Sequence, residues 1–203
     1  MEKLALFVGL MRDGGPINGL ILALYAAAWA IFSGRLLYFF RSRCSRGRFF
    51  KALAGEEPLP NRSSPLCRIV EAFREAEGMS DGARSEKLDR EGTLLKAEME
   101  RGFGGFSFIG TIAPLLGLLG TITGLMNAFG QIERRGAGVD IAFLSGGIRE
   151  AMITTATGLV TALCALGAEK LFAALSEARL RDMAVAVSLL EESRAEKRRQ
   201  DSP

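Results

Sequence analysis

Hydroxyl side chains are the groups in this sequence that could do chemistry in an apolar environment. Residues 151–168, which include no Lys, Arg, Asp or Glu, contain four threonines within eight residues: Thr154, Thr155, Thr157 and Thr161. A further threonine, Thr121, lies in a second charge-free stretch at residues 102–131. Hydroxyls can order water and can hydrogen-bond a carboxylate. The alternative interpretation is that each hydroxyl only bonds the carbonyl four residues earlier in its own helix.

A titratable group is missing from the same stretches. They contain no Asp or Glu, and histidine is absent from the whole sequence. If protons move along these hydroxyls, they must be carried by an acid from another chain or along a wire of water molecules. Glu150 stands directly before residues 151–168 and is the carboxylate nearest to their four threonines in the sequence, which makes it a candidate for the proton pathway. The alternative for Glu150 is a solvated residue at the membrane boundary.

The length of the charge-free stretches indicates what they are. There are three of them, at residues 14–34, 102–131 and 151–168. A helix needs about 20 apolar residues to cross a bilayer core of roughly 30 Å. The sequence therefore predicts an all-α membrane protein with three transmembrane helices, at residues 14–40, 102–130 and 147–169. The second and third helices are expected to extend into the cytoplasm as long helices.

Small residues form a stripe along the second and third predicted spans. The members of this stripe are Gly110, Gly117, Gly120 and Gly124 in the second span, and Gly158 and Ala162 in the third. A repeat near seven residues keeps such a stripe facing one neighbour, and small residues let helix backbones approach closely in lipid. We therefore predict that these positions pack helix against helix.

Depth in the membrane brings two of the hydroxyls to a similar level. Thr121 lies nine residues before Gly130, and Thr155 lies five residues after Glu150. At about 1.5 Å per residue, Thr121 lies roughly 13 Å and Thr155 roughly 8 Å below the outer boundary of the membrane. The antiparallel spans thus offer hydroxyls at comparable height. A ring of several copies would turn the pair into a belt of hydroxyls around a lumen.

The distribution of charge predicts the orientation in the membrane. Residues 35–51 contain six basic side chains and no acidic one, whereas only Lys3 and Arg12 are basic before the first span. The positive-inside rule then places residues 1–13 in the periplasm and residues 41–101 in the cytoplasm. A periplasmic loop at residues 131–146 and a cytoplasmic helical tail at residues 170–203 complete the predicted topology.

The cytoplasmic segments are expected to contain one loop and two amphipathic helices. Pro58, Pro60 and Pro65 predict a loop. From Ser85 onward the pattern predicts a helix with Leu88 and Leu95 on one face. The tail carries an apolar face that should pack against that helix: Leu180, Met183, Val187 and Leu190. The glycines at positions 102, 104 and 105 are expected to loosen the junction with the second span.

Composition argues against several functional classes. The lack of histidine excludes imidazole catalysis and His-ligated metals, and Cys44, Cys67 and Cys164 lack the spacing of a metal site. No nucleophile–base set is present, so we expect no enzyme, no cofactor and no metal. The net charge of +3 does not indicate a nucleic-acid partner, because the basic residues cluster beside the predicted spans.

Three stretches carry a resemblance to a known family. PLLGLLGTITGLMNAFG at residues 114–130 and GGIREAMITTATGLVTALCAL at residues 146–166 closely resemble the paired signatures of the MotA/TolQ/ExbB proton-channel family. GGPINGLILALYAAAWAIFSGRLLYFFR at residues 14–41 looks like the first span of that family. The chain is short and lacks the fourth span and large cytoplasmic domain of MotA-type stators, so it is more similar to the ExbB/TolQ branch.

The resemblance implies a specific assembly. Members of that branch are inner-membrane proteins that form homopentamers, with a pore lined by the second and third spans. The pore encloses single spans from two copies of an ExbD- or TolR-like partner, which supplies an essential Asp. Proton flow drives motion that a TonB- or TolA-like protein passes to the outer membrane. The expected function is thus a motor subunit that energises TonB-dependent transport or maintains the cell envelope.

The same resemblance assigns roles to particular residues. Thr121 matches the pore threonine of the GLLGT motif, Thr155 matches the threonine of the TA.GL motif, and Glu150 matches the acid before it. One departure is Cys164, which stands where the family usually has a proline, so a kink at that point is in question. Two alternatives stay open at this level: a scaffold that stabilises a partner and conducts nothing, and a channel that needs no partner.

Overall fold

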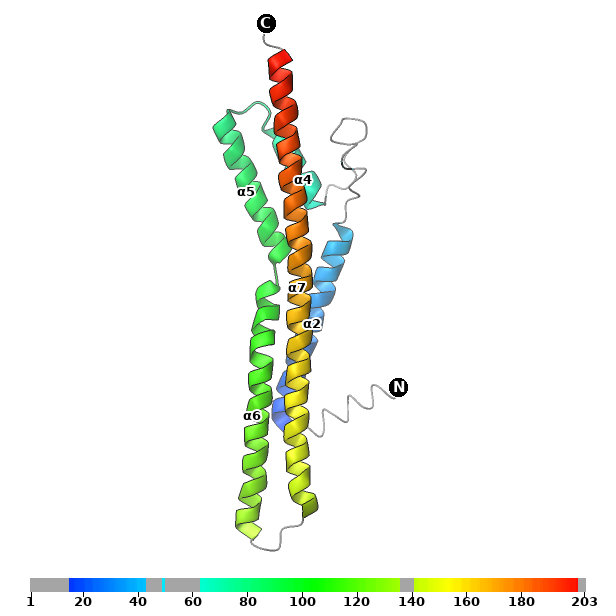
Figure 1. The fold of residues 1–203 in the computed structure, drawn as a ribbon, viewed down its shortest axis with the longest axis vertical. Helices are drawn as coiled ribbons and strands as arrows, with labels where there is room; N and C mark the ends of the chain where they lie inside the picture. Colours follow the sequence, from blue (N-terminus) through cyan, green and yellow to red (C-terminus); the bar gives the residue numbers. More distant parts are fainter. Residues whose placement is uncertain (1–14, 43–48, 50–62, 136–140, 201–203) are drawn as a thin grey trace. The chain divides into compact units, whose positions relative to one another are not determined.

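The computed structural model describes residues 15–42, 49, 63–135 and 141–200 of the 203-residue chain. Its helices are α2 (Gly15–Arg41), α4 (Pro65–Glu75), α5 (Asp81–Glu100), α6 (Phe103–Arg135) and α7 (Ile141–Gln200), as Figure 1 shows. The described ranges contain no strand. Three helical stretches are long and apolar enough to cross a membrane: Gly15–Arg41, Asp81–Gly130 and Ser145–Glu196. The predicted all-α fold with three spanning helices is therefore confirmed.

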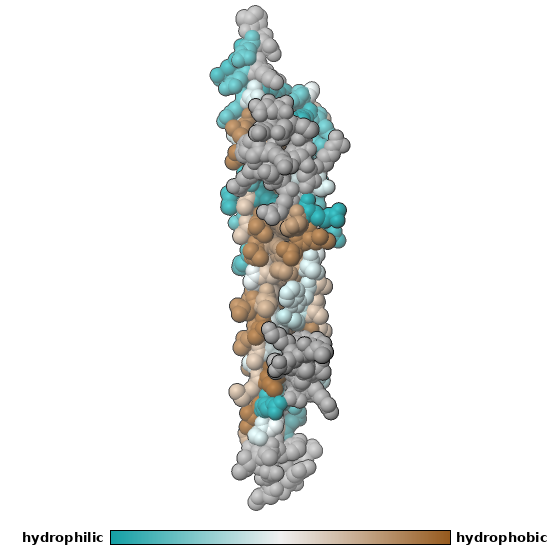
Figure 2. Space-filling view, turned by 90° about the vertical axis from the view of Figure 1, so that its right-hand side faces the viewer, coloured by the Kyte–Doolittle hydropathy of each residue, from teal (hydrophilic) through white to brown (hydrophobic). Residues whose placement is uncertain are grey.

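The chain divides into two compact units. Unit 1 comprises residues 1–33 and 102–170, and unit 2 comprises residues 34–101 and 171–203. Helices α2 and α7 supply segments to both units, and the charge-free stretches fall almost entirely in unit 1. Large apolar side chains remain exposed on the spanning helices, including Leu119, Met126 and Leu163. Figure 2 shows such apolar surface in brown, and it is the surface expected of helices that meet lipid or other chains.

The break between α5 and α6 spans Arg101 and Gly102. Gly102 has a φ of 91°, a left-handed conformation that residues with a Cβ rarely adopt, and α6 begins at the next residue. The loosened junction expected from three glycines is therefore narrower than predicted, because Gly104 and Gly105 lie within α6.

Helix α4 departs from the sequence-based prediction, which places a loop through Pro65. The helix begins at Pro65, where proline suits the first turn because its missing N–H would have no helical partner. The other two prolines of that loop, Pro58 and Pro60, lie outside the described residues. Helix α5 also begins earlier than expected: the Ser80 hydroxyl accepts a hydrogen bond from the N–H of Ala83 and caps the helix.

The core of unit 2 is formed by α4, α5 and the second half of α7. Its buried members are Phe49, Leu66, Cys67, Ile69, Val70, Ala72, Phe73, Leu88, Leu95, Met99, Met183 and Ala186. Leu180, Val187 and Leu190 pack against this cluster from the tail. The predicted packing of the tail against the helix before the second span is confirmed by these contacts.

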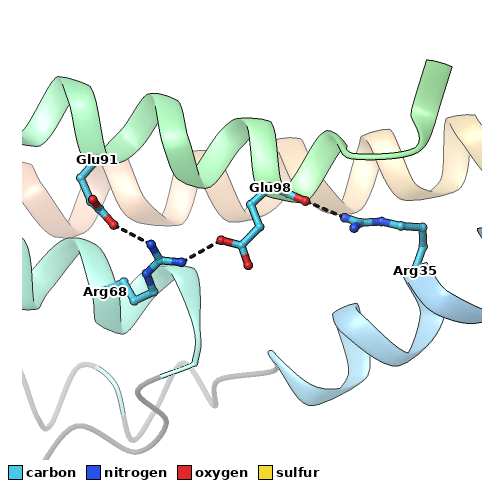
Figure 3. A network of polar contacts seen from close by, with 4 residues as sticks. All are labelled: Arg35, Arg68, Glu91 and Glu98. Carbon is cyan, nitrogen blue, oxygen red and sulfur yellow. Dashed lines mark hydrogen bonds and ion pairs between the residues drawn. The ribbon is translucent and has the colours of Figure 1, made fainter.

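Charged contacts join α2, α4 and α5 within unit 2 (Figure 3). Arg68 lies between two carboxylates, with its nitrogens 2.8 Å from Glu91 and 2.7 Å from Glu98. Burial alone lowers the pKa of Arg68, but the hydrogen bonds to Glu98 and Glu91 outweigh it, so the pKa is raised. Arg35 donates to the backbone carbonyls of Glu98, at 3.1 Å, and Met99. These carbonyls have no partner within α5, so Arg35 caps its end.

A second arginine caps the end of α2. Arg179 donates to the carbonyl oxygen of Phe39 at 2.8 Å and to the hydroxyl of Ser42. Its guanidinium carbon lies 4.8 Å from the centre of the Phe39 ring, which stacks on Phe172 with 5.5 Å between centroids. The last turn of α2 is thus attached to α7 by both backbone and aromatic contacts.

Replacing Leu95 by Ala is expected to destabilise unit 2 by about 2–5 kcal/mol, because this core side chain is 0% exposed and its loss leaves a cavity. Leu94 is 55% exposed and provides the matched control; Leu94→Ala should cost less than about 0.5 kcal/mol. Thermal unfolding of the purified protein in detergent, followed by circular dichroism, measures the difference. Equal melting temperatures for the two variants would contradict this description of the core.

Candidate functional site

Helices α6 and α7 pack within unit 1 with almost no side chain between their backbones. A Cβ atom added to Gly158 would lie 2.5 Å from the carbonyl oxygen of Ala113 and 3.2 Å from the Cα of Gly117. A Cβ atom added to Gly117 would lie 3.1 Å from the Cα of Thr155. Few real side chains tolerate such distances, so the absence of a Cβ is what allows the two backbones to approach.

The close contact continues toward the connected ends of the two helices. A Cβ on Gly120 would overlap the methyl group of Thr154. One on Gly124 would lie 3.0 Å from the Cβ of Ala151. A Cβ on Gly147 would lie 3.2 Å from the Cβ of Ala128. We call this row of small residues on α6 and α7 the glycine contact.

The predicted packing positions lie on or beside this contact. Gly117, Gly120, Gly124 and Gly158 belong to it, as described above. Gly110 extends it in the other direction, since a Cβ there would lie 2.5 Å from the Cγ of Leu166. Ala162 is buried. Helix α7 continues through Cys164 without interruption, so the helix is not broken at this residue.

The hydroxyl of Thr155 crosses the glycine contact. It donates to the carbonyl oxygen of Gly117 at 2.8 Å. In an α-helix this carbonyl also accepts from the N–H four residues later, which is the N–H of Thr121. Thr155 and Thr121 are therefore both within one helical turn of the same carbonyl. Thr155 thus meets α6 one helical turn before Thr121, so the two threonines lie at similar levels along the pair of helices.

Both threonines lie away from α2. Helix α2 approaches α6 at Gly105, where a Cβ would lie 2.8 Å from Cδ1 of Ile31. At 100° per residue, Gly105 and Thr121 point about 160° apart on α6. Thr157 contacts α2, and it points about 160° from Thr155 on α7. We call the resulting side of the α6–α7 pair, opposite α2, the threonine face.

The hydroxyl of Thr121 is satisfied within α6. It donates to the carbonyl oxygen of Leu118 at 2.7 Å, and its side chain is half-buried. The surrounding threonine face is apolar and exposed, with Leu118, Ile122 and Leu125 on α6 and Met152 and Leu159 on α7. A polar pair thus lies in the middle of an otherwise apolar surface.

The remaining threonines of α7 line the interior of unit 1. Thr154 is 1% exposed and donates to the carbonyl of Glu150 at 2.9 Å. Thr161 is 3% exposed and donates to the carbonyl of Thr157 at 2.8 Å. Thr154 and Thr161 therefore have the structural role expected of many threonines in membrane helices, because each hydroxyl bonds the carbonyl four residues earlier in its own helix. Thr155 differs from them in bonding the neighbouring helix.

An amide that the sequence reasoning missed lies in the first span. Asn18 of α2 is 0% exposed, and its Oδ1 lies 2.6 Å from the hydroxyl of Thr157. The signal was present in the sequence, because an amide inside a charge-free span is costly in hydrocarbon unless it finds a partner.

Glu150 lies apart from Thr121 and Thr155. Its carboxylate is directed at the first residue of α2, where a Cβ on Gly15 would overlap Oε1 of Glu150. Gly15 has a φ of 66°, so glycine is required there both for its conformation and for space. Glu150 thus belongs to the α2 side of α7. The described residues contain no group of His, Cys, Asp and Glu side chains that could hold a metal ion.

Replacing Gly158 by Ala is expected to separate α6 from α7, because the new Cβ would lie 2.5 Å from a backbone carbonyl that cannot rotate away. We expect a loss of about 1–3 kcal/mol of stability. A Cβ atom added to Gly167 of the same helix would have nothing within 4 Å, which makes Gly167→Ala the matched control. Melting in detergent compares the two; a Gly158→Ala protein as stable as the control would argue against backbone contact at this point.

Comparison with known proteins agrees with this architecture. The model of the MotA/TolQ/ExbB proton channel family matches residues 62–184. The biopolymer transport protein ExbB of Salmonella typhimurium is 33% identical over 195 residues, covering 85% of this chain and 79% of that protein. ExbB of Pseudomonas putida is 35% identical over 106 residues, covering 52% of this chain and 32% of that protein.

A third relative matches a shorter segment. The putative biopolymer transport protein ExbB-like 1 of Synechocystis is 43% identical over 84 residues, covering 39% of this chain and 33% of that protein. The family match covers more than half of this chain, and it spans both helices of the glycine contact. The chain therefore belongs to the MotA/TolQ/ExbB proton channel family, on the ExbB side of it.

Proposed function

We propose that this multi-pass membrane protein is the ExbB-like subunit of a motor driven by the proton-motive force in the inner membrane. The observation that carries the proposal is the hydrogen bond from Thr155 of α7 to the Gly117 carbonyl of α6, beside Thr121. The hydroxyls of Thr155 and Thr121 lie close to this carbonyl, in charge-free segments of α6 and α7. We call these two hydroxyls and the Gly117 carbonyl the polar level. In a family of proton channels, that level is the best candidate for the lining of the path.

The chemistry of this level requires a partner. Its hydroxyls can order water and can accept a hydrogen bond from a protonated carboxylic acid through their lone pairs. They cannot store a proton near neutral pH, and no acidic residue occurs in the charge-free stretches. An ExbD- or TolR-like protein with an intramembrane Asp would supply the missing group. Its single span would lie against the threonine face.

The exposed apolar side chains of the threonine face support an assembled state. Leu118, Ile122, Met152 and Leu159 surround the two threonines and are exposed in a single chain. We propose a homopentamer in which these faces surround the spans of the partner. A TonB- or TolA-like protein would receive the motion, in TonB-dependent transport or envelope maintenance. The N-terminus would be periplasmic and the C-terminus cytoplasmic, as the charge distribution predicts.

Glu150 remains a predicted participant at the outer end of the path. Its carboxylate lies on the α2 side of α7, and the threonine face lies on the opposite side. A route from Glu150 to Thr155 would therefore have to pass around α7 through water at the mouth. This geometry favours Thr121 and Thr155 over Glu150 as the residues to test first.

A non-conducting scaffold is the second candidate function, and one observation favours it. The hydroxyls of Thr121 and Thr155 already donate to carbonyl oxygens, at 2.7 Å and 2.8 Å, as purely structural threonines would. A structural role predicts that a hydroxyl removed from this level changes stability but not proton movement. The two functions thus differ in a measurable way.

The test uses the chain co-assembled with its single-span partner in liposomes. Thr155→Val keeps the shape of the side chain and removes the hydroxyl, and we expect proton flux under an applied potential to fall at least about tenfold, which corresponds to about 1.4 kcal/mol. Thr161→Val is the matched control, because Thr161 bonds only its own helix and should leave the flux unchanged. Thr121→Val tests the second hydroxyl of the level in the same assay.

The outcomes separate the two candidates. A fall in flux for Thr155→Val with normal assembly supports the conducting motor. Normal assembly with flux at the level of the Thr161→Val control would contradict a conducting role for Thr155. Complete lack of flux in the unaltered complex, despite correct assembly, would favour the scaffold.

A further inference from the structure

Helix α2 is attached to α7 by polar contacts at the start of the first span. The Oδ1 of the buried Asn18 lies 2.6 Å from the hydroxyl of Thr157. The same hydroxyl lies 2.9 Å from the Thr154 carbonyl and 3.1 Å from the Ile153 carbonyl of its own helix, so Asn18 is the closest of its three acceptors. One turn earlier on α2, the carboxylate of Glu150 fills the space above Gly15. A carboxylate is favourable beside the first turn of a helix because free N–H groups point toward it. Two polar contacts therefore hold α2 on the same side of α7.

The contact of α7 with α6 includes a hydrogen bond close by. Thr155 donates to the Gly117 carbonyl, and Thr155 points about 160° away from Thr157 on α7. Helix α7 is thus hydrogen-bonded on nearly opposite sides within three residues. A rotation of α7 about its own axis would lengthen at least one of these bonds.

Between Gly117 and Gly158 the glycine contact is formed by backbone atoms, while the side chains of Thr154 and Leu166 fill the spaces over Gly120 and Gly110. A rotation of α7 about its own axis moves these atoms sideways past α6. At a Cα radius of about 2.3 Å, a rotation of about 20° moves a backbone atom by roughly 0.8 Å. Such a displacement is largely sideways to a hydrogen bond that points at the neighbouring helix, so it turns the bond away from its preferred alignment and weakens it. The hydrogen bonds on the two sides of α7 therefore favour one rotation of this helix.

We propose that Asn18 is a positioning residue: through Thr157 it sets the rotation of α7 about its axis and so keeps Thr155 on the Gly117 carbonyl. Helix α2 then has a role in the proton path although it does not contribute to the threonine face. The proposal deepens the proposed function and rests on it only for the measurement of flux. Its structural part is tested independently.

A disulfide across the glycine contact reports the rotation of α7. A Cβ on Gly147 would lie 3.2 Å from the Cβ of Ala128, a little less than the roughly 3.5–4.5 Å between the Cβ atoms of a disulfide, so Ala128→Cys with Gly147→Cys can form a disulfide once the two helices separate slightly. The pair is introduced into the full chain after Cys44, Cys67 and Cys164 are replaced by Ser. The rate of oxidation by copper phenanthroline is then measured in membranes that also contain the partner.

Removal of the amide should slow this reaction. We expect Asn18→Leu to lower the rate of disulfide formation several-fold, because α7 is free to leave the orientation that aligns the thiols. Ser33→Ala is the matched control on α2: the Ser33 hydroxyl bonds only the Ala30 carbonyl of its own helix, at 3.0 Å, and its removal should have no effect. An unchanged rate for Asn18→Leu would overturn the proposal.

Variants of Thr157, the hydrogen-bond partner of Asn18, distinguish loss of this hydrogen bond from a general folding defect. Thr157→Val keeps the shape of the side chain and should slow the reaction as much as Asn18→Leu, and the double variant should be no slower than either. Thr157→Ser retains the hydroxyl and should restore the rate. Additive effects, or no rescue by Ser, would also overturn the proposal. If the rate falls while proton flux stays normal, the positioning role stands and the threonine path of the proposed function fails.

Discussion

The backbone contact between α6 and α7 is the constraint on which the rest of unit 1 depends. It exists only where both helices lack a large side chain, as at Gly117 and Gly158, because an added Cβ would collide with backbone atoms. The short distance is what allows a threonine hydroxyl on α7 to reach a carbonyl on α6. In lipid there is no hydrophobic gain from pairing two apolar helices, so packing of this kind and the hydrogen bond it permits must hold the pair together.

The charge-free stretches contain no Asp, Glu, Lys, Arg or His, and this has an equally direct consequence. The charge-free helices can be buried against one another and against lipid without the cost of desolvating a charge. For the same reason they contain no carboxylate or imidazole that could bind and release a proton near neutral pH. Several polar side chains in these helices have hydrogen-bond partners. Thr154 and Thr161 donate to carbonyls of their own helix. The Thr157 hydroxyl donates to Asn18 of α2, and Thr155 donates to α6.

Much of this arrangement could be predicted from residue types and spacing. The three spanning helices follow from uninterrupted apolar length, and the similar levels of Thr121 and Thr155 follow from comparable depths on antiparallel helices. Helix α4 could not be found in the same way, because its first residue is one of three nearby prolines that also indicate a loop, and its helical character depends on burial against α5 and α7. The partner of Asn18 and the direction of Glu150 depend on how α2 is rotated against α7, which periodicity does not determine.

A proton path along the threonine face requires water there, and the presence of water can be measured directly. With Cys44, Cys67 and Cys164 replaced by Ser, single cysteines are placed at Thr155, on that face, and at Val160, which is 57% exposed and points about 140° away on α7. Their reaction with a membrane-impermeant, hydrophilic thiol reagent is compared in the complex with the proposed single-span partner. A path lined by Thr155 predicts that its cysteine reacts several-fold faster than the one at Val160. Equal reactivity, or faster reaction at Val160, would mean that the threonine face meets lipid and that no path follows it.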